Sequence, residues 1–204
     1  MTELLRGDAL TLYRGDHCLF TDLDFALNAG EAMLIQGPNG SGKTSLLRCV
    51  AGLLDLEEGQ ILWRDRPTLS HRQEFHADLA WFAHRPGCKR DLTVVENLRL
   101  EAGLRHMAFE RLDSVLERLS LTRVRDLPFR ALSAGQQRRV ALARLLLSTA
   151  TLWLMDEPFT NLDAAGRELV IAVMREHLDG GGSCLFASHL DVELHDAMPR
   201  VKLA

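Results

Sequence analysis

The sequence predicts an α/β fold in which a parallel sheet covered by helices is joined to an antiparallel β subdomain and an inserted α-helical subdomain. Apolar runs typical of buried strands alternate with helical patterns over most of the chain, as in parallel sheets. The first thirty residues instead alternate between apolar and polar positions and are punctuated by glycines, which favours short antiparallel strands. Between residues 93 and 130 the periodicity is helical, which indicates a helical insertion.

Composition narrows the class of protein. A chain of 204 residues with 47% hydrophobic and 25% charged residues suits one compact, soluble domain with a large core. The net charge of −4 weighs against a nucleic-acid partner without excluding it. The cysteines lack any C-x-x-C pair and predict free thiols rather than a zinc site or a disulfide framework: Cys18, Cys49, Cys88 and Cys184. The N-terminus lacks a signal-peptide pattern, and the longest nearly uncharged run, 145–155, is too short to span a bilayer.

The elements of the first half follow in order. The alternating segments "LLRGDALTLYRG" and "LFTDLDFALNAGE" predict the antiparallel strands. The continuous apolar run "AMLIQ", 32–36, predicts a strand buried on both faces. The segment "KTSLLRCVAGLL" predicts a helix that begins after Gly42 and ends near Gly52. A further strand is expected at "DLAWFA", 78–83.

The second half begins with the helical patterns "VVENLRLEAGL" and "FERLDSVLERL". The helix "QQRRVALARLLLS" and the strand "TLWLM" follow, then the helix "DAAGRELVIAVMREHL" and the buried strand "CLFAS". We therefore assign about 1–84 and 132–204 to the core and β subdomain, and about 85–131 to the helical subdomain. The cluster Arg138, Arg139 and Arg144 could contact phosphate, but we expect it to be the solvated face of its helix.

A glycine-rich loop carries the first chemical signal. The segment "GPNGSGKT" satisfies G-x-x-x-x-G-K-[ST] and lies between a predicted strand and a predicted helix, where its backbone N–H groups can cradle phosphates. Lys43 can reach the β- and γ-phosphates, and the Thr44 hydroxyl can ligate Mg²⁺. The candidate phosphate-binding residues are Gly37, Pro38, Asn39, Gly40, Ser41, Gly42, Lys43, Thr44 and Ser45.

Two adjacent carboxylates follow an apolar strand in "WLMDEPF", 153–159. An unpaired buried carboxylate is costly, so a nearby cation is expected. Asp156 suits a Mg²⁺ site, since a second strand of phosphate-loop proteins ends in such an aspartate. Glu157 can orient and deprotonate the water that attacks the γ-phosphate.

These segments together resemble the ATP-binding cassette (ABC) family, whose motifs occur here in family order as "GPNGSGKT", "LSAGQ", "LWLMDEP", "TNLD" and "SHL". Ser133 can cap the helix that begins near Gln136, and Gly135 allows close approach of a ligand. The resemblance implies ATP and Mg²⁺ as ligands and a head-to-tail homodimer holding two ATP molecules. It also implies that Ser133, Gly135 and Gln136 close over the partner's γ-phosphate. In the same way, Asp163 would link the two sites, and His189 would contact the γ-phosphate.

Two positions depart from the family pattern. His84 stands where the family usually has a glutamine that senses Mg²⁺ and the attacking water. Histidine titrates near neutral pH and either replaces the glutamine or alters the sensing. The side chain that stacks on adenine should lie near residue 13, where Tyr13 is the candidate and Arg14 the alternative.

At finer grain the chain resembles the cytochrome c biogenesis ATP-binding export proteins, in "AHRPGCKRDLTVVENL" among other segments. This resemblance implies a peripheral protein on the cytoplasmic face of the bacterial inner membrane, with integral membrane subunits resembling CcmB and CcmC. There ATP hydrolysis would drive haem handling or release of a haem-loaded chaperone. The alternatives are the ATPase of another small transporter and a soluble ABC protein acting on ribosomes or DNA. A small-molecule kinase would leave "LSAGQ" and Glu157 unexplained.

Overall fold

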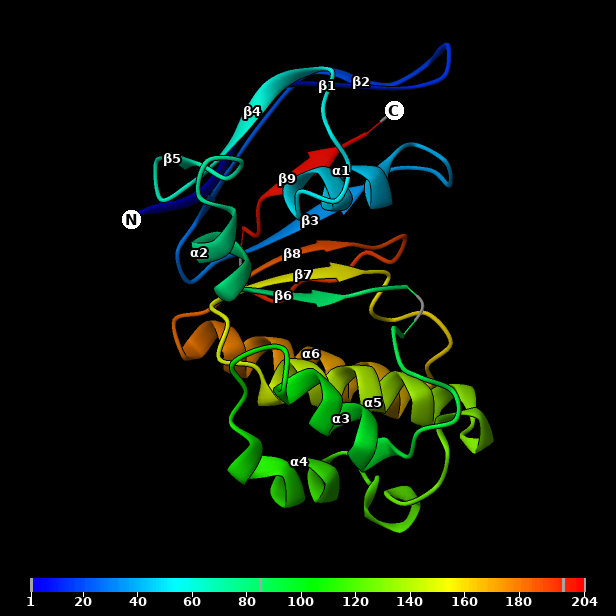
Figure 1. Ribbon diagram of the computed structural model, residues 1–204. Coiled ribbons are helices and arrows are strands. Elements are labelled where there is room, and N and C mark those ends of the chain that lie inside the picture. The colour runs from blue at the N-terminus through cyan, green and yellow to red at the C-terminus, as the bar shows by residue number, and fades with distance from the viewer. Residues whose placement is uncertain (1, 85, 196, 204) are drawn as a thin grey trace.

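The computed structural model describes residues 2–84, 86–195 and 197–203, and arranges them as two sheets with a layer of helices (Figure 1). A four-stranded antiparallel sheet has the order β2-β1-β4-β5, and a five-stranded parallel sheet has the order β6-β7-β8-β3-β9. The predicted α/β class, with a parallel core and an antiparallel subdomain, is confirmed.

The antiparallel sheet is built on two long strands, β1 (Glu3–Arg14) and β2 (His17–Asn28), each of 12 residues. Short strands were expected here, and that expectation is wrong. Several register shifts interrupt the β1–β2 pairing, and such bulges bend a strand without ending it. The alternation of apolar and polar residues is therefore interrupted at these bulges, although the strand continues through them. The sheet is completed by β4 (Glu58–Trp63) and β5 (Arg66–Pro67), neither of which was predicted.

The parallel sheet forms the centre of the molecule. Its strands are β3 (Ala32–Gln36), β6 (Leu79–Phe82), β7 (Leu152–Asp156), β8 (Ser183–Ala187) and β9 (Arg200–Lys202). Side chains of β3, β7 and β8 alternate between two hydrophobic clusters on the two faces of the sheet. Because both faces are covered, these strands are apolar at almost every position, as predicted for β3, β7 and β8.

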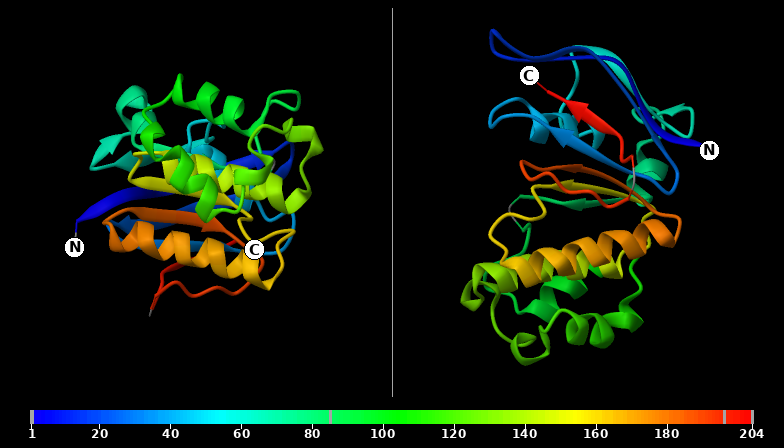
Figure 2. Two further views of the ribbon diagram at one scale, coloured as in Figure 1. Left: turned by 90° about the horizontal axis from the view of Figure 1, so that it is seen from below. Right: turned by 180° about the vertical axis from the view of Figure 1, so that it is seen from behind.

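Helix α1 (Lys43–Val50) packs on the face shared with the antiparallel sheet. On the other face α5 (Ala134–Leu147) and α6 (Ala164–Asp179) lie against the parallel sheet, as both views of Figure 2 show. Helices α3 (Val94–Ala102) and α4 (Leu112–Arg118) pack beyond α5, whereas the short α2 (Arg72–Ala77) precedes β6. Within the described part of the chain, no helix is long and apolar enough to cross a bilayer.

Helix α5 is enclosed on most of its surface. Its buried residues cover more than one face, because the sheet lies on one side and α3 and α4 lie on the other. The four cysteines are free thiols, as predicted, and Cys49 and Cys184 are buried.

Candidate functional site

Three neighbouring strands of the parallel sheet end at the same edge. Strand β8 lies between β3 and β7, and all three run in the same direction. The chain continues from β3 into the glycine-rich loop, from β7 into Glu157, and from β8 towards His189. In open α/β sheets, ligands bind at this carboxyl edge, so the topology gathers segments that are distant in sequence into one site.

The glycine-rich loop adopts a conformation that requires its glycines. Gly40 and Gly42 have φ angles of 90° and 99°, a region that disfavours L side chains. Gly42 is also the N-cap of α1 and makes no side-chain cap, so the first N–H groups of α1 keep no side-chain acceptor from this residue. Helix starts of this kind bind anions.

Two polar groups of this loop fit a phosphate ligand. Lys43 is only 7% exposed, and its Nζ donates to the carbonyl oxygens of Gly37 (2.8 Å) and Pro38 (3.0 Å). Ser41 Oγ is buried and has no hydrogen-bond partner among the described atoms. A buried hydroxyl without a partner is unfavourable, and a phosphate oxygen would satisfy it.

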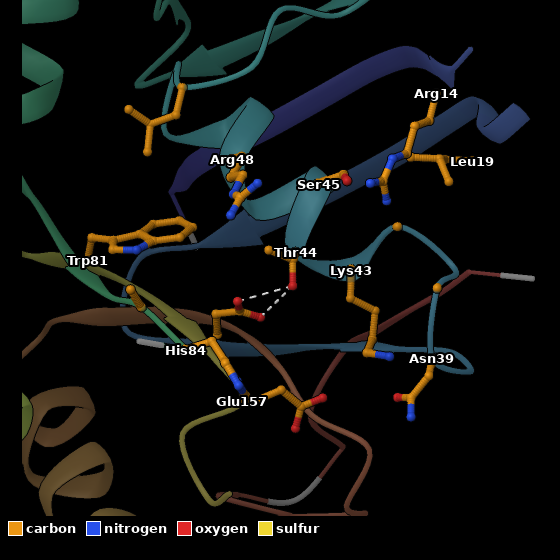
Figure 3. A pocket seen from close by; sticks show the side chains of 15 residues that line it. Arg14, Leu19, Asn39, Lys43, Thr44, Ser45, Arg48, Trp81, His84 and Glu157 are labelled. Carbon is orange, nitrogen blue, oxygen red and sulfur yellow. Dashed lines mark hydrogen bonds between the residues drawn. The ribbon is translucent and has the colours of Figure 1, made fainter. Parts of the chain in front are cut away.

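The loop and the end of β7 are joined directly. The Thr44 hydroxyl donates to Asp156 Oδ1 and Oδ2, at 2.9 and 3.1 Å (dashed lines in Figure 3). Asp156 is 3% exposed, and burial raises its pKa, although the bond from Thr44 opposes the shift. A hydroxyl and a buried carboxylate in direct contact form a set of oxygen donors that suits Mg²⁺.

Glu157 lines the site and has an unusual backbone conformation. Its φ is 49°, and its N–H donates to the Ala187 carbonyl oxygen at 3.0 Å. Its Oε2 lies 2.8 Å from Nδ1 of His189, which is half exposed. Glu157 and His189, which were predicted separately as the base and as a γ-phosphate contact, are therefore in hydrogen-bond contact, which positions the carboxylate and leaves the second imidazole nitrogen available.

Lys43, Thr44, Asp156 and Glu157 line one open cleft of about 750 Å³, whereas Ser41 and His189 are not among the residues that line it. Figure 3 shows the side chains of Lys43, Thr44, His84 and Glu157 gathered in this cleft. The remaining predicted loop residues that line the cleft are Asn39, Gly40, Gly42 and Ser45. Its cationic side chains are Arg14, Lys43 and Arg48, a concentration of positive charge that suits a polyphosphate.

The cleft contains the alternative candidate for the adenine contact and three further residues that the sequence did not identify. Arg14, rather than Tyr13, is among the lining residues, and Tyr13 is 47% exposed and pairs with Cys18 in the neighbouring strand. Side chains of adjacent strand residues point to opposite faces, so only one of the two can face the ligand. Leu19, Arg48 and Trp81 also line the cleft, and no motif marked them.

The segment Leu132–Gln136 lies outside this cleft. Ser133 caps α5, with its Oγ accepting from Gln136 N at 3.2 Å, and Gln136 Oε1 accepts in return from Ser133 N at 2.9 Å. A Cβ at Gly135 would meet nothing within 4 Å, so the helix start is open. Asp163 likewise caps α6 through Gly166 N at 2.8 Å. The predicted cap at Ser133 is confirmed, and none of these four residues joins the phosphate loop of its own chain.

The expectation that Arg138, Arg139 and Arg144 form a solvated face is wrong. Arg138 is 6% exposed and bonds to main-chain oxygens behind the cleft. Arg144 is bound to Glu101 at 2.8 Å, and Arg139 donates to the Leu119 carbonyl oxygen at 3.3 Å. The physical reason is that α5 is covered on several sides, so its arginines meet carbonyl and carboxylate oxygens of neighbouring elements instead of water.

Comparisons with known proteins agree with this geometry. A family model described as ABC transporter matches residues 20–160. The chain is 44% identical over 194 residues to the cytochrome c biogenesis ATP-binding export protein CcmA of Yersinia pestis, covering 93% of this chain and 87% of that protein. It is 42% identical to the CcmA of Pasteurella multocida (95% and 92%) and 44% identical to that of Methylococcus capsulatus (92% and 93%).

Solved structures show the same fold. The ATP-binding subunit of an ABC transporter superposes with a TM-score of 0.86 at 25% identity, covering 98% of this chain and 85% of that one. An ATP-binding cassette of an ABC transporter in its ADP conformation gives a TM-score of 0.80 at 22% identity, covering 100% and 88%.

Proposed function

This chain belongs to the ABC transporter family and is an ATP-binding, ATP-hydrolysing member of it, and on that premise we propose that it powers a membrane complex of cytochrome c biogenesis. The similarity to CcmA proteins, which runs over nine tenths of the chain, supports this assignment. The observation that carries the enzymatic part is the contact between Thr44 and Asp156, which brings the phosphate loop and the acidic strand end together.

The roles in binding follow from the charges. Lys43 and the N–H groups of the loop bind the β- and γ-phosphates, and Ser41 Oγ gains the partner it lacks. Thr44 and Asp156 would hold Mg²⁺, which supplies Lewis-acid stabilisation of the charge on the phosphate oxygens. Arg14 and Leu19 provide a wall for the adenine ring, since a guanidinium can stack on an aromatic face.

Hydrolysis requires a base beside the γ-phosphate. Glu157 accepts the proton of the attacking water, whose oxygen bonds to phosphorus as the bond to the β–γ bridging oxygen breaks, leaving ADP and phosphate. His189 fixes the orientation of the Glu157 carboxylate through the 2.8 Å contact and can donate to the γ-phosphate from its other nitrogen. His84, which also lines the cleft, is suited to hydrogen-bond the same water.

A second copy of the chain would complete the site. Ser133, Gly135 and Gln136 form an open helix start that lies outside the cleft of their own chain. In a head-to-tail dimer this start would face the γ-phosphate of the partner, and Asp163 would lie between the two sites. Two ATP molecules would then be enclosed between the protomers.

The proposed setting is the cytoplasmic face of the bacterial inner membrane, with integral membrane subunits resembling CcmB and CcmC. Hydrolysis would there be coupled to haem handling or to release of a haem-loaded chaperone. The relatives are named cytochrome c biogenesis ATP-binding export proteins, and that wording supports a role in cytochrome c biogenesis and export.

Affinity purification of the tagged chain from detergent-solubilised membranes tests the proposal. Integral membrane proteins should copurify, together with haem detected by its absorbance. A tagged Lys43→Ala variant serves as a control for whether recovery depends on nucleotide. Recovery of ribosomal proteins or DNA in place of membrane proteins would contradict the proposed setting, whereas a purified chain without Mg-ATP hydrolysis in any complex would contradict the enzymatic assignment.

A further inference from the structure

Arg138 is a buried cation whose hydrogen bonds go to main-chain oxygens. It is 6% exposed, and burial lowers its pKa to about 10, although the charges of Asp156 and Glu157 partly offset this shift. Its Nε is buried without a partner among the described atoms. Burying a guanidinium in this way is costly for stability, so a gain in stability does not explain its position.

The guanidinium joins two loops that both enter the cleft. Nη1 donates to the carbonyl oxygens of Ala83 (3.1 Å) and His84 (3.0 Å), which follow β6. Nη2 donates to the carbonyl oxygens of Asp156 (3.3 Å) and Glu157, at the end of β7. Strands β6 and β7 are neighbours in the sheet, but their pairing ends at Phe82 and Met155. Arg138 therefore connects the segments that follow β6 and β7, beyond the point where the strands pair.

Arginine suits this position because of its shape. The planar guanidinium presents several donors in a fixed fork, whereas a lysine ammonium acts as a point charge. The plane is further held over the Phe82 ring, with Cζ 4.2 Å from the ring centroid. Fixed in this way, the fork sets the spacing between the carbonyl groups of His84 and Glu157.

Glu157 needs such support. Its φ of 49° is unfavourable for a residue with a side chain and persists only where neighbouring groups hold it. Its N–H donates to the Ala187 carbonyl oxygen, and its own carbonyl oxygen accepts from Arg138 and from the Thr160 N–H at 3.3 Å. Because this backbone aims the carboxylate towards His189, loss of the Arg138 bond, the one that links Glu157 to the loop of His84, would misdirect the base.

We propose that Arg138 is a positioning residue for ATP hydrolysis, a clamp that fixes the loops of His84 and Glu157 relative to each other. The inference rests on the proposed function in assigning Glu157 as the base. Helix α5 carries the clamp and is capped by Ser133, so the helix expected to contact the second nucleotide also holds the catalytic loops of its own site.

The test compares Arg138→Met and Arg138→Lys with wild type, using Arg139→Met as the matched control. Arg139 is the adjacent residue of α5, and its bond leads to Leu119, away from the cleft. Three quantities are measured: kcat, the Kd for Mg-ATP, and hydrogen exchange of the nucleotide-free protein in peptides covering 79–84 and 155–160. The exchange measurement requires no enzymatic activity.

Arg138→Met should lower kcat about 10- to 100-fold, since misplacing a catalytic group by about 1 Å has effects of this size. Its Kd for Mg-ATP should stay within about twofold, because Lys43 and the loop are not touched. Amide exchange should accelerate in both peptides together. Arg138→Lys should recover part of kcat, and Arg139→Met should match wild type in all three measurements.

Wild-type kcat and exchange in Arg138→Met would overturn the proposal, and so would parallel losses of kcat, nucleotide affinity and thermal stability. If Arg138→Met does not fold, Arg138→Lys decides alone, and a wild-type kcat in that variant counts against the clamp. If wild-type protein hydrolyses no ATP, the proposed function fails, while the exchange data still support or refute the link between the two loops.

Discussion

Replacing Lys43 by alanine separates nucleotide binding from stability. The Lys43 ammonium is buried beside the phosphate loop and bonds to two main-chain oxygens, those of Gly37 and Pro38. In the ATP complex the same ammonium would face the β- and γ-phosphates. The substitution therefore removes a charge partner of the ligand and, in the free protein, only two bonds to carbonyl groups.

The expected magnitude follows from these contacts. Removing one partner of a desolvated charge pair costs about 2–5 kcal/mol, and about 1.4 kcal/mol changes an affinity tenfold, so the Kd for Mg-ATP should rise about 30- to 5,000-fold. In the free protein, the carbonyl oxygens that lose their bond to Lys43 remain near water, since Pro38 is exposed. The substitution also removes a buried ammonium, whose burial opposes folding. We expect the free energy of unfolding to change by about 1 kcal/mol or less, equivalent to about 2–4 °C in Tm.

Titration with a fluorescent ATP analogue and thermal unfolding measure the two quantities on the same preparation. Lys202→Ala, which removes an exposed lysine of β9, is the matched control and should bind like wild type. A Kd within tenfold of wild type for Lys43→Ala would refute the assigned role. A fall in Tm of about 10 °C or more would show that Lys43 supports the fold instead.

Three further predictions concern the same cleft. Glu157→Gln should retain Mg-ATP affinity, lose about 10²- to 10⁴-fold in kcat and accumulate as an ATP-bound dimer in light scattering; hydrolysis at the wild-type rate would contradict the assignment of the base. Asp156→Asn should stabilise the nucleotide-free protein at pH 7, because burial raises the pKa of Asp156 and the ionised form is the disfavoured one. The stability advantage of Asp156→Asn over wild type should shrink as the pH falls through the raised pKa towards the ordinary value of 3.8, because the wild-type carboxyl is then protonated. Calorimetry of both proteins at pH 7 and pH 4 measures the difference in Tm. Equal Tm values of the variant and wild type at pH 7 would contradict this prediction. Arg14→Ala should weaken ATP binding by about 0.5–2 kcal/mol, whereas Tyr13→Ala should leave the Kd near that of wild type, and the reverse order in a titration would restore Tyr13 as the adenine contact.

The buried strands were predictable because sandwiched strands leave a continuous apolar signal. Strand β3 has the predicted bounds, and β7 and β8 deviate by a residue at either end. The cap at Ser133 also followed from local chemistry, since its bond to Gln136 lies within one turn. Local rules succeed where the partner of a residue lies nearby in sequence.

The elements that were missed depend on distant partners. Strand β4 begins with exposed residues and contains Gly59, and it forms only because β1 offers an edge along its length. Strand β9 has three residues and pairs with β3, far away in sequence. Neither segment carries enough periodicity by itself to indicate a strand.

Arg138 shows what a helical pattern can and cannot reveal. It lies three, four and seven residues before the buried positions Ala141, Leu142 and Leu145, a spacing that places it on the core face of α5. That signal was present in the sequence, but the charge favoured a solvated face instead. The carbonyl groups that receive its bonds belong to two other loops, and no periodicity predicts them.

A crystal structure of Glu157→Gln grown with Mg-ATP would show whether the nucleotide binds between the glycine-rich loop and the acidic end of β7. We expect the triphosphate to follow the loop from Gly37 to Thr44 and a cation to replace the bond between the Thr44 hydroxyl and Asp156, contacting both. The amide side chain introduced at position 157 should then lie beside the γ-phosphate. Nucleotide bound elsewhere, with the Thr44–Asp156 bond intact and the loop empty, would contradict the assignment of this cleft as the ATP site.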